Sequence, residues 1–365
     1  MRPHQPDYIL IFIVFILVAF GLTILSSASV VLSQNIFGQN YYFLKHQLIY
    51  GLSLGLLFFF VCQKIHYKHW RKFAFPLILL SLFFLGLVFI PEIGYSYGKA
   101  KRWITLGSFS IQPFEFIKIT YILYLSALLC KRGEVNKVLK ESLIPLLIIT
   151  SVIGLMVLFQ PNMSALIIIA VIAFTLYFLA GAKISYLVGT ASLVLVGLFA
   201  LIKAVPYRMD RLTIFLHPEL DPQGIGYQIN QALLAIGSGG LFGLGLGAHG
   251  VQKWGYLPEP IGDSIFAITA EELGLIGAGI LVILFVLLAC RGLKIAKNAP
   301  NKFGCLVAGG ITCWLFFQAF INITAISGLS PLTGMPLPFI SYGGTALVVA
   351  LAGAGILVNI SKYTK

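Results

Sequence analysis

Asp263 is the residue best placed to do chemistry in this chain of 365 amino acids. It ends a loop rich in Pro and Gly, 257–262, and directly precedes a long apolar run. Ionisable groups at the edge of an apolar segment are costly and usually serve function. As the N-cap of a helix, the Asp263 carboxylate would accept backbone N–H bonds and the helix dipole would favour its ionised form, which predicts a low pKa. Helix capping alone is the structural alternative.

Cationic and carboxylate side chains alternate in two further segments, 98–104 and 112–118, which flank the start of another apolar run. Arginine suits a pyrophosphate group because its guanidinium forms bidentate hydrogen bonds, so Arg102 is a candidate phosphate ligand. Trp103 is more simply explained as an aromatic residue of the membrane interface.

Two adjacent carboxylates, Glu271 and Glu272, follow Asp263 by eight and nine residues. On a helix they would lie roughly 12 to 14 Å deeper than Asp263, and neighbouring residues do not face one cavity. We predict that they support the site structurally through buried hydrogen bonds, and a proton or ion pathway is the alternative.

The run Gly245-Leu-Gly-Ala-His-Gly250 matches the dinucleotide fingerprint GxGxxG. That fingerprint requires a preceding strand and a following helix in a βαβ unit, and a Gly-rich loop among apolar segments does not provide them. We therefore reject nucleotide binding and expect close backbone packing, with an amide nest for phosphate oxygens as the alternative.

The composition requires that a lipid bilayer is the solvent, because 59% of residues are hydrophobic, 10% are charged and the mean hydropathy is +0.95. A helix needs about 20 apolar residues to span the hydrocarbon. The sequence predicts an all-α integral membrane protein with ten transmembrane helices. Their approximate bounds are 8–31, 43–62, 73–90, 114–130, 142–159, 164–181, 185–205, 264–290, 304–326 and 343–360.

Basic residues indicate the orientation, because short cytoplasmic loops retain Lys and Arg. With both termini cytoplasmic, most of the 25 basic residues lie inside, so the net charge of +13 reflects topology and we predict no nucleic-acid partner. Most acidic residues then lie near the outer face, which predicts that function is there. The predicted outer segment 91–118 holds three basic residues on the side where positive charge is disfavoured, which indicates an anionic ligand, or else salt bridges to the acidic loop: Lys99, Lys101 and Arg102.

We predict one polytopic domain over residues 1–365 that contains a large extracytoplasmic loop, 206–263, between the seventh and eighth helices. Its apolar residues make it unsuited to disorder, so it should pack as re-entrant or interfacial helices over the bundle. The five cysteines all fall in predicted cytoplasmic helix halves and show no CxxC spacing, so neither an outer disulfide nor a structural zinc site is expected.

Several motifs, in order along the chain, resemble those of the SEDS family, which includes RodA, FtsW and SpoVE. Their sequences resemble FtsW more than RodA. The resemblance covers essentially the whole chain. Its motifs are Lys101-Arg-Trp-Ile104 with Gln112-Pro113, Asp221-Pro222 through Gly226-Tyr-Gln228, Ile236-Gly-Ser-Gly-Gly-Leu241, Leu257-Pro-Glu259, Asp263-Ser-Ile-Phe-Ala267, Glu271-Glu-Leu-Gly274 and Pro336-Leu-Pro-Phe-Ile-Ser-Tyr-Gly-Gly344.

The resemblance implies a peptidoglycan glycosyltransferase of the bacterial cytoplasmic membrane that polymerises lipid II on the outer face, with a class B penicillin-binding protein as partner. Asp263 falls on the family's essential aspartate and is the expected catalytic base of an inverting transfer with a pyrophosphate leaving group. A divalent cation, Mg or Mn, is the one cofactor considered. A lipid II flippase and a non-catalytic scaffold are the alternatives. The residues expected to bind substrate are Lys101, Arg102, Gln112, Glu115, Lys118 and Glu259, and those expected to support the site are Trp103, Glu271 and Glu272.

Three positions depart from the family pattern. Phe114 stands where the family often has Ser, His46 where it often has Arg, and Asn162 where it often has Asp. If the usual arginine binds phosphate, His46 would do so only when protonated. Asn162 lowers the local negative charge.

Overall fold

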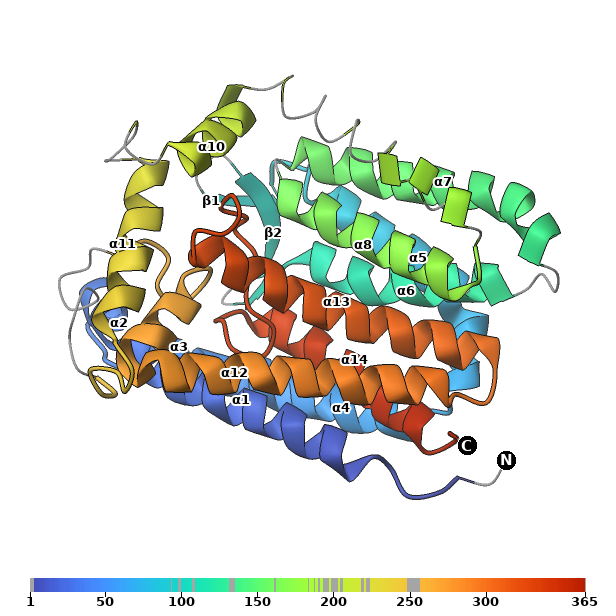
Figure 1. Cartoon of the computed structure of the whole chain (residues 1–365), viewed down its shortest axis with the longest axis horizontal. Coiled ribbons are helices and arrows are strands. Elements are labelled where there is room, and N and C mark those ends of the chain that lie inside the picture. Colours follow the sequence, from blue (N-terminus) through green and yellow to red (C-terminus); the bar gives the residue numbers. More distant parts are fainter. Residues whose placement is uncertain are drawn as a thin grey trace.

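The computed structural model describes the larger part of the chain, and its residues form a bundle of long helices with a small sheet at one end (Figure 1). The described residues are 3–92, 94–97, 100–106, 109–130, 135–160, 162–182, 184–186, 188–189, 191–192, 197, 203, 206–217, 220, 224–247 and 257–364.

Helices account for nearly all of the described structure. In chain order they are α1 (Tyr8–Ala28), α2 (Val30–Phe37), α3 (Tyr42–His46), the π-helix η1 (Gln47–Leu52), α4 (Ser53–Lys64), α5 (Tyr67–Leu87), α6 (Pro113–Cys130), α7 (Val135–Phe159), α8 (Met163–Leu179), α10 (Pro206–Leu216), α11 (Ile225–Ser238), α12 (Ile265–Lys297), α13 (Lys302–Ile326) and α14 (Gly344–Ser361).

The all-α membrane class is confirmed, and the chain is a multi-pass membrane protein. Among the described residues, seven helical segments are long and apolar enough to cross a membrane, and each coincides with a predicted span. Two shorter apolar helices, Leu143–Phe159 and Met163–Leu179, coincide with the fifth and sixth predicted spans. The predicted span 185–205 lies mostly outside the described residues, so the count of ten helices stays a prediction.

α5 and α12 are among the helices that extend beyond the predicted apolar runs. α5 begins at Tyr67, not at residue 73, and α12 ends at Lys297, not at residue 290. Both extensions carry basic residues, which the hydropathy pattern assigned to loops. Long basic side chains place their apolar stems along a helix and their charges in the interfacial region, so the helices continue beyond the apolar run.

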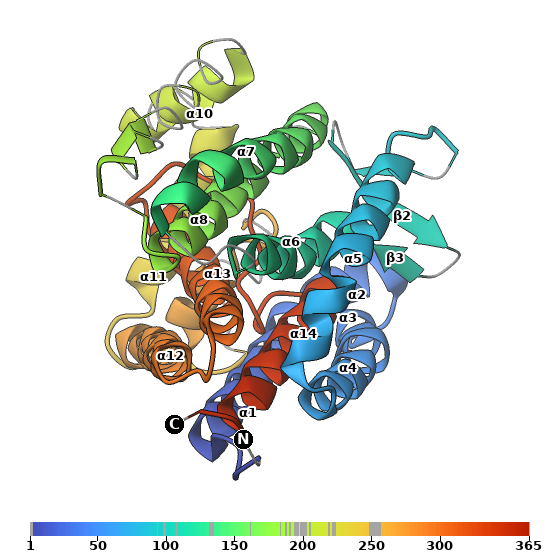
Figure 2. The same cartoon turned by 90° about the vertical axis from the view of Figure 1, so that its right-hand side faces the viewer.

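The two chain termini lie side by side at one end of the bundle (Figures 1 and 2). The His4 N–H donates to the Lys362 carbonyl at 2.8 Å, and the Arg291 guanidinium pairs with the Asp7 carboxylate at 2.8 Å. Termini on one side fit an even number of membrane crossings. Which side faces the cytoplasm stays a prediction from the basic residues.

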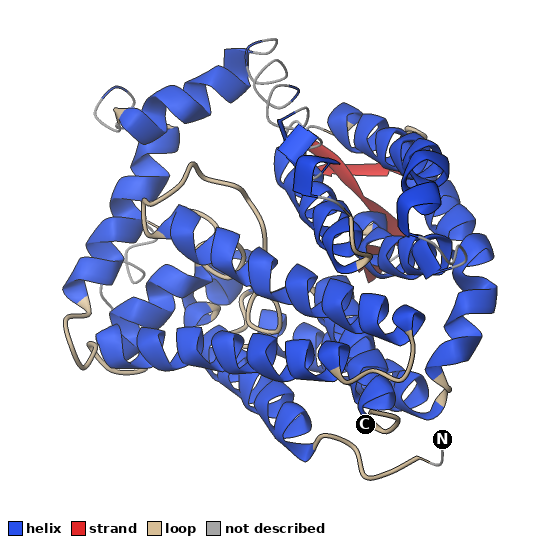
Figure 3. Ribbon diagram, turned by 45° about the vertical axis from the view of Figure 1, so that its right-hand side comes forward, coloured by secondary structure: helices blue, strands red, loops and turns tan. Residues whose placement is uncertain are grey.

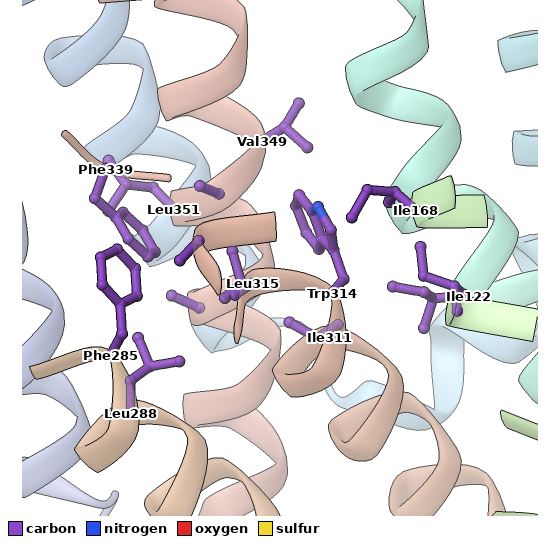
Figure 4. Packing of buried hydrophobic residues seen from close by; sticks show 14 of the residues in the cluster. Ile122, Ile168, Phe285, Leu288, Ile311, Trp314, Leu315, Phe339, Val349 and Leu351 are labelled. Carbon is purple, nitrogen blue, oxygen red and sulfur yellow. The ribbon is translucent and has the colours of Figure 1, made fainter. Parts of the chain in front are cut away.

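The core centres on α13, which contacts α6, α8, α12 and α14. Trp314 is 1% exposed and its ring lies among Ile122 of α6, Ile168 of α8 and Val349 of α14 (Figure 4). Because lipid removes the hydrophobic driving force between helices, close van der Waals packing of such side chains is what holds α13 in place. This packing fixes the helix that carries part of the candidate site.

A three-stranded antiparallel sheet was not predicted. Its strands are β1 (Gly94–Tyr97), β2 (Ala100–Leu106) and β3 (Phe109–Ile111), in the order β1-β2-β3, and Figure 3 shows them beside the helices. In β2 polar and apolar side chains partly alternate, which suits a half-buried strand. The sheet holds Arg102 at the start of α6.

A break in α12 is the second unpredicted feature. Gly274 has φ 67° and ψ −169° within the helix, and the glycine loop 239–247 fills the break. Leu244 N–H donates to the Glu271 carbonyl and Leu275 N–H donates to the Gly240 carbonyl, each at 2.9 Å. A Cβ on Gly243 would lie 2.1 Å from the Glu272 carbonyl oxygen, so only glycine permits this approach.

Candidate active site

Asp263 lines a cavity of about 190 Å³. The start of α12 and the end of α13, which border this cavity, lie at the end of the bundle opposite the chain termini (Figure 1). This cavity, the Asp263 cavity, lies between the start of α12, the end of α13 and the segment that follows α13. Its lining residues are Arg211, Gln228, Glu259, Asp263, Asn322, Ala325, Ile326, Leu332, Thr333 and Gly334.

Side-chain hydrogen bonds help to fix the loop 257–264 that presents Asp263. Ser264 Oγ donates to the Pro258 carbonyl at 2.8 Å, and Ser341 Oγ donates to the Gly262 carbonyl at 2.7 Å. Asn322 Nδ2 donates to the Asp263 carbonyl at 2.9 Å. These bonds satisfy backbone groups in a segment that is neither helix nor strand, as irregular backbone at membrane depth requires.

The predicted low pKa of Asp263 is wrong. Burial, reinforced by the negative charge of Glu259, raises its pKa to about 6, although the guanidinium groups of Arg102 and Arg211 act in the opposite direction. The N-cap residue of α12 is Ser264, which makes no side-chain cap bond. The cavity, not the helix dipole, therefore sets the protonation of Asp263.

A second, smaller cavity of about 30 Å³, the Arg102 cavity, adjoins the first at Gly334. It brings together four of the residues predicted to bind substrate: Arg102, Gln112, Glu115 and Lys118. Phe114 and Asn162, two of the positions that depart from the family pattern, also line it. Asn162 caps α8, because its Oδ1 accepts a hydrogen bond from the Ala165 N–H at 3.2 Å. The other lining residues are Ala165, Ile168, Gln318, Gly334, Met335 and Pro336.

Lys118 is 2% exposed and its charge is already balanced. Its Nζ lies 2.7 Å from the Glu115 carboxylate and donates to Gln318 Oε1 at 2.9 Å. It also lies 5.0 Å from the centre of the Trp314 ring. These contacts give Lys118 a structural part in the wall of the Arg102 cavity, beside the phosphate role that the sequence predicted.

Arg102 and Lys101 are neighbours on β2, and successive strand residues point to opposite faces. Arg102 is half-buried and its Nε donates to the Gln160 carbonyl at 3.3 Å, whereas Lys101 is exposed. Trp103 pairs with Tyr95 across the sheet and is half-buried. The structure thus brings Arg102, and not Lys101 or Trp103, to the cavity. Lys99 lies outside the described residues.

Glu271 and Glu272 are each 1% exposed and lie away from both cavities, in the region of the α12 break. Glu272 Oε1 accepts hydrogen bonds from Ser27 Oγ and, at 3.3 Å, from the Gly247 N–H. Glu272 therefore joins α1, α12 and the glycine loop. This placement fits a supporting part in the fold at a distance from Asp263.

The glycine-rich match 245–250 serves packing where the structure describes it. Gly245 N–H donates to the Glu272 carbonyl at 2.9 Å, and Gly247 N–H donates to Ser27 Oγ at 2.9 Å. These amides are directed at protein acceptors. His249 and Gly250 lie outside the described residues.

Arg211, Gln318 and Asn322 were missed as site residues. On α13, Trp314, Gln318 and Asn322 recur every four residues, which places them on one helix face. Amides at this spacing in an otherwise apolar span are a signal that sequence reasoning could have used. Arg211 gave a weaker signal, as a basic residue in a predicted outer loop.

Comparison with known proteins gives the same family as the motifs. The family model described as cell cycle protein (FTSW_RODA_SPOVE) matches residues 8–365. Stage V sporulation protein E of Bacillus subtilis (strain 168) is 38% identical over 364 residues, which cover 100% of this chain and 99% of that protein. The probable peptidoglycan glycosyltransferase FtsW of Coxiella burnetii (strain RSA 493 / Nine Mile phase I) is 41% identical over 353 residues, which cover 96% of this chain and 94% of that protein.

Solved structures share the fold. A chain of the structure described as "Structural coordination of polymerization and crosslinking by a peptidoglycan synthase complex" matches with a TM-score of 0.81 at 28% identity, covering 98% of this chain and 97% of that chain. The rod shape determining protein RodA of Thermus thermophilus matches with a TM-score of 0.71 at 29% identity, covering 99% of this chain and 98% of that chain. The chain therefore belongs to the FtsW, RodA and SpoVE family of cell cycle proteins.

Proposed function

We propose that the chain is a peptidoglycan glycosyltransferase that polymerises lipid II into glycan strands on the outer face of the bacterial cytoplasmic membrane. The observation that carries the proposal is the adjacency of the two cavities, one lined by Asp263 and the other by Arg102. A relative 41% identical carries the name probable peptidoglycan glycosyltransferase, which supports the same activity.

Asp263 is proposed as the general base. A base works best when its pKa is near the working pH, and a pKa of about 6 leaves Asp263 ionised at neutral pH yet more basic than an ordinary aspartate. It would take the proton from the acceptor sugar hydroxyl as that oxygen attacks the anomeric carbon of the donor. The bond to the diphosphate then breaks with inversion.

Arg102 is proposed to hold the leaving diphosphate. It lines the adjoining cavity and its guanidinium acts electrostatically on Asp263, which supports a site shared by cation and base. Fixed cations that face developing negative charge stabilise the transition state without reorganisation. Gln112 and Glu259 supply further polar groups, one in each cavity. Lys118 and Glu115 are proposed to support the cavity wall as a pair.

A divalent cation, Mg²⁺ or Mn²⁺, is proposed to assist. Among the described residues there is no cluster of three acidic, His or Cys side chains, so these residues alone do not form a full site. Magnesium sites commonly use one or two carboxylates together with substrate phosphates, and Glu259 with Asp263 supplies two. The cation would neutralise charge on the diphosphate. Polymerisation before and after chelation, with each metal restored separately, tests this.

A class B penicillin-binding protein is the proposed partner, and both termini are proposed to be cytoplasmic. The partner is supported by the fold shared with a chain of a peptidoglycan synthase complex that coordinates polymerization and crosslinking. The orientation is supported by the basic residues at the end of the bundle where the termini meet, among them Arg291 and Lys294.

Purified chain with its cognate penicillin-binding protein, supplied with lipid II in liposomes, tests the function. The proposal expects glycan polymer. Translocated monomer would identify a flippase, and unchanged lipid II would leave the chain as a scaffold. The site favours the enzyme over the flippase because the Asp263 cavity and the Arg102 cavity adjoin at Gly334, beside the end of α13 that lies opposite the chain termini.

A further inference from the structure

The segment Leu332–Pro336 is irregular backbone, yet side chains from three helices hold it in place. It crosses the site between the Asp263 cavity and the Arg102 cavity. Four of its five carbonyls accept a side-chain hydrogen bond: Leu332 from Arg211 Nη1 at 3.1 Å, Thr333 from Ser164 Oγ, Met335 from Asn322 Nδ2 at 2.6 Å and Pro336 from Gln318 Nε2 at 2.8 Å.

Gly334 is the residue of this segment that lines both cavities. Its φ is +62°, in the left-handed region that favours glycine. A Cβ built on Gly334 would meet Asp263 Oδ2 at 3.3 Å, and among the described residues that is the one atom it would meet within 4 Å. In the described part of the chain, the space beside Gly334 is therefore open except for the carboxylate of the proposed base.

We propose that Gly334 is a positioning residue that keeps open the passage between the two cavities, across which the glycosyl group passes from the diphosphate to the acceptor hydroxyl. This inference rests on the proposed function, because it names the point where donor and acceptor meet. In that reaction the acceptor oxygen bonds to the anomeric carbon, the bond from that carbon to the diphosphate oxygen breaks, and Asp263 takes the hydroxyl proton.

The hydrogen bonds around Gly334 explain why its lack of a side chain matters. A flexible loop could shift to accommodate a methyl group, but this segment is tied on both sides of Gly334 to α8, α10 and α13. The contact at 3.3 Å would instead displace the Asp263 carboxylate or remove water from it. Both effects act on the base directly.

Gly328 offers a matched control in the same connection after α13. Its φ is +72°, so a side chain there carries the same kind of backbone strain as one at Gly334. The three nearest described atoms that a Cβ on Gly328 would meet all belong to the Leu233 side chain, at 3.5 to 3.9 Å, which are ordinary contacts. Gly328 lines neither the Asp263 cavity nor the Arg102 cavity.

The experiment compares Gly334→Ala and Gly334→Asn with Gly328→Ala and Gly328→Asn. Asparagine tolerates the left-handed conformation better than alanine, so the Asn pair retains the added bulk with less backbone strain if an Ala variant folds poorly. Each chain is purified with its penicillin-binding partner, and lipid II polymerisation is measured against substrate concentration and pH.

Both Gly334 variants should lose roughly 10- to 100-fold in kcat, because small displacements of reacting groups have effects of this size. The Gly328 variants should stay within about twofold of wild type. The acid limb of the Gly334 profiles should also move to higher pH, because a desolvated carboxylate holds its proton more tightly. The charged groups that face Asp263 in this measurement are Glu259, Arg211 and Arg102, which all variants retain.

Gly334 variants that polymerise lipid II like the Gly328 variants, with an unshifted acid limb, overturn this inference and leave the proposed function intact. Equal losses at both positions also overturn it, because backbone strain then explains the result. A wild-type complex that leaves lipid II unpolymerised overturns the proposed function together with the inference.

Discussion

Asn322 donates one amide hydrogen to the carbonyl of Asp263 at 2.9 Å and another to the carbonyl of Met335 at 2.6 Å. One side chain on α13 thereby ties the proposed base to the segment that forms the wall of its cavity. Asn322 is 1% exposed, and without its amide both carbonyls would lose this hydrogen-bond donor.

Replacing Asn322 by Ala should therefore lower both stability and turnover. Leaving a buried acceptor unsatisfied costs about 1–3 kcal/mol, and the freed Asp263 loop should lower kcat in the folded fraction. Thermal unfolding in detergent and lipid II polymerisation measure the two effects. Asn359→Ala is the control, because Asn359 of α14 is equally buried and donates to the carbonyl of Gln63 on α4 at 2.7 Å. Equal kcat losses in both variants would contradict the link to Asp263.

The rate of polymerisation should fall as the pH is lowered through about 6, because the base must be ionised and burial raises its pKa to that value. Glu259→Gln removes a negative charge that raises the pKa of Asp263. The acid limb should then move to lower pH. A pH–rate profile of both chains measures this, and an acid limb that does not move to lower pH would contradict the action of the Glu259 charge on the base.

Arg102→Ala should have the opposite effect on the acid limb. The Arg102 guanidinium lowers the pKa of Asp263, so its removal lets that pKa rise. The same variant should need more lipid II to reach half-maximal rate, because it loses a phosphate ligand. Arg71→Ala serves as the control, because Arg71 is exposed and lies near the start of α5. Unchanged substrate dependence with an unmoved acid limb would remove Arg102 from the site.

Lys118 and Glu115 should behave as one unit in stability. Lys118→Met or Glu115→Gln alone leaves a charge buried without its partner. Breaking a buried ion pair in this way typically lowers the free energy of unfolding by about 3–5 kcal/mol. The double variant removes both charges and should be more stable than either single variant. Thermal unfolding of all four chains forms a double-mutant cycle. Additive losses would mean that the 2.7 Å pair contributes no coupling.

Much of the fold and part of the site could be predicted from the sequence. Apolar runs located the spans, since a helix in lipid must satisfy its own backbone. The order of motifs indicated the family and with it Asp263, Arg102, Gln112 and Lys118, which the structure gathers in two adjoining cavities. Residues that face one another across helices, such as Asn322 and Asp263, carry no mark of their contact in one sequence.

Other features depend on tertiary approach. The pKa of Asp263 could not be predicted, because local sequence suggested a helix dipole whereas burial and the charge of Glu259 decide it. The break in α12 arises at Gly274, where the glycine loop 239–247 supplies backbone hydrogen bonds on both sides of the break. Lys101 and Arg102 differ in position because a strand alternates its faces, and no strand was expected.

The account depends most directly on the Asp263 carboxylate. The measurement is glycan polymer formed from lipid II by purified Asp263→Asn in complex with its penicillin-binding protein, beside wild type and Asp210→Asn, which makes the same change at an exposed position on α10. Loss of a general base predicts a decrease of roughly 10²- to 10⁴-fold. Because a neutral amide avoids burying an ionised carboxylate, thermal stability at pH 7 should be unchanged or higher. Polymer formed by a stable Asp263→Asn complex at the wild-type rate would contradict the account.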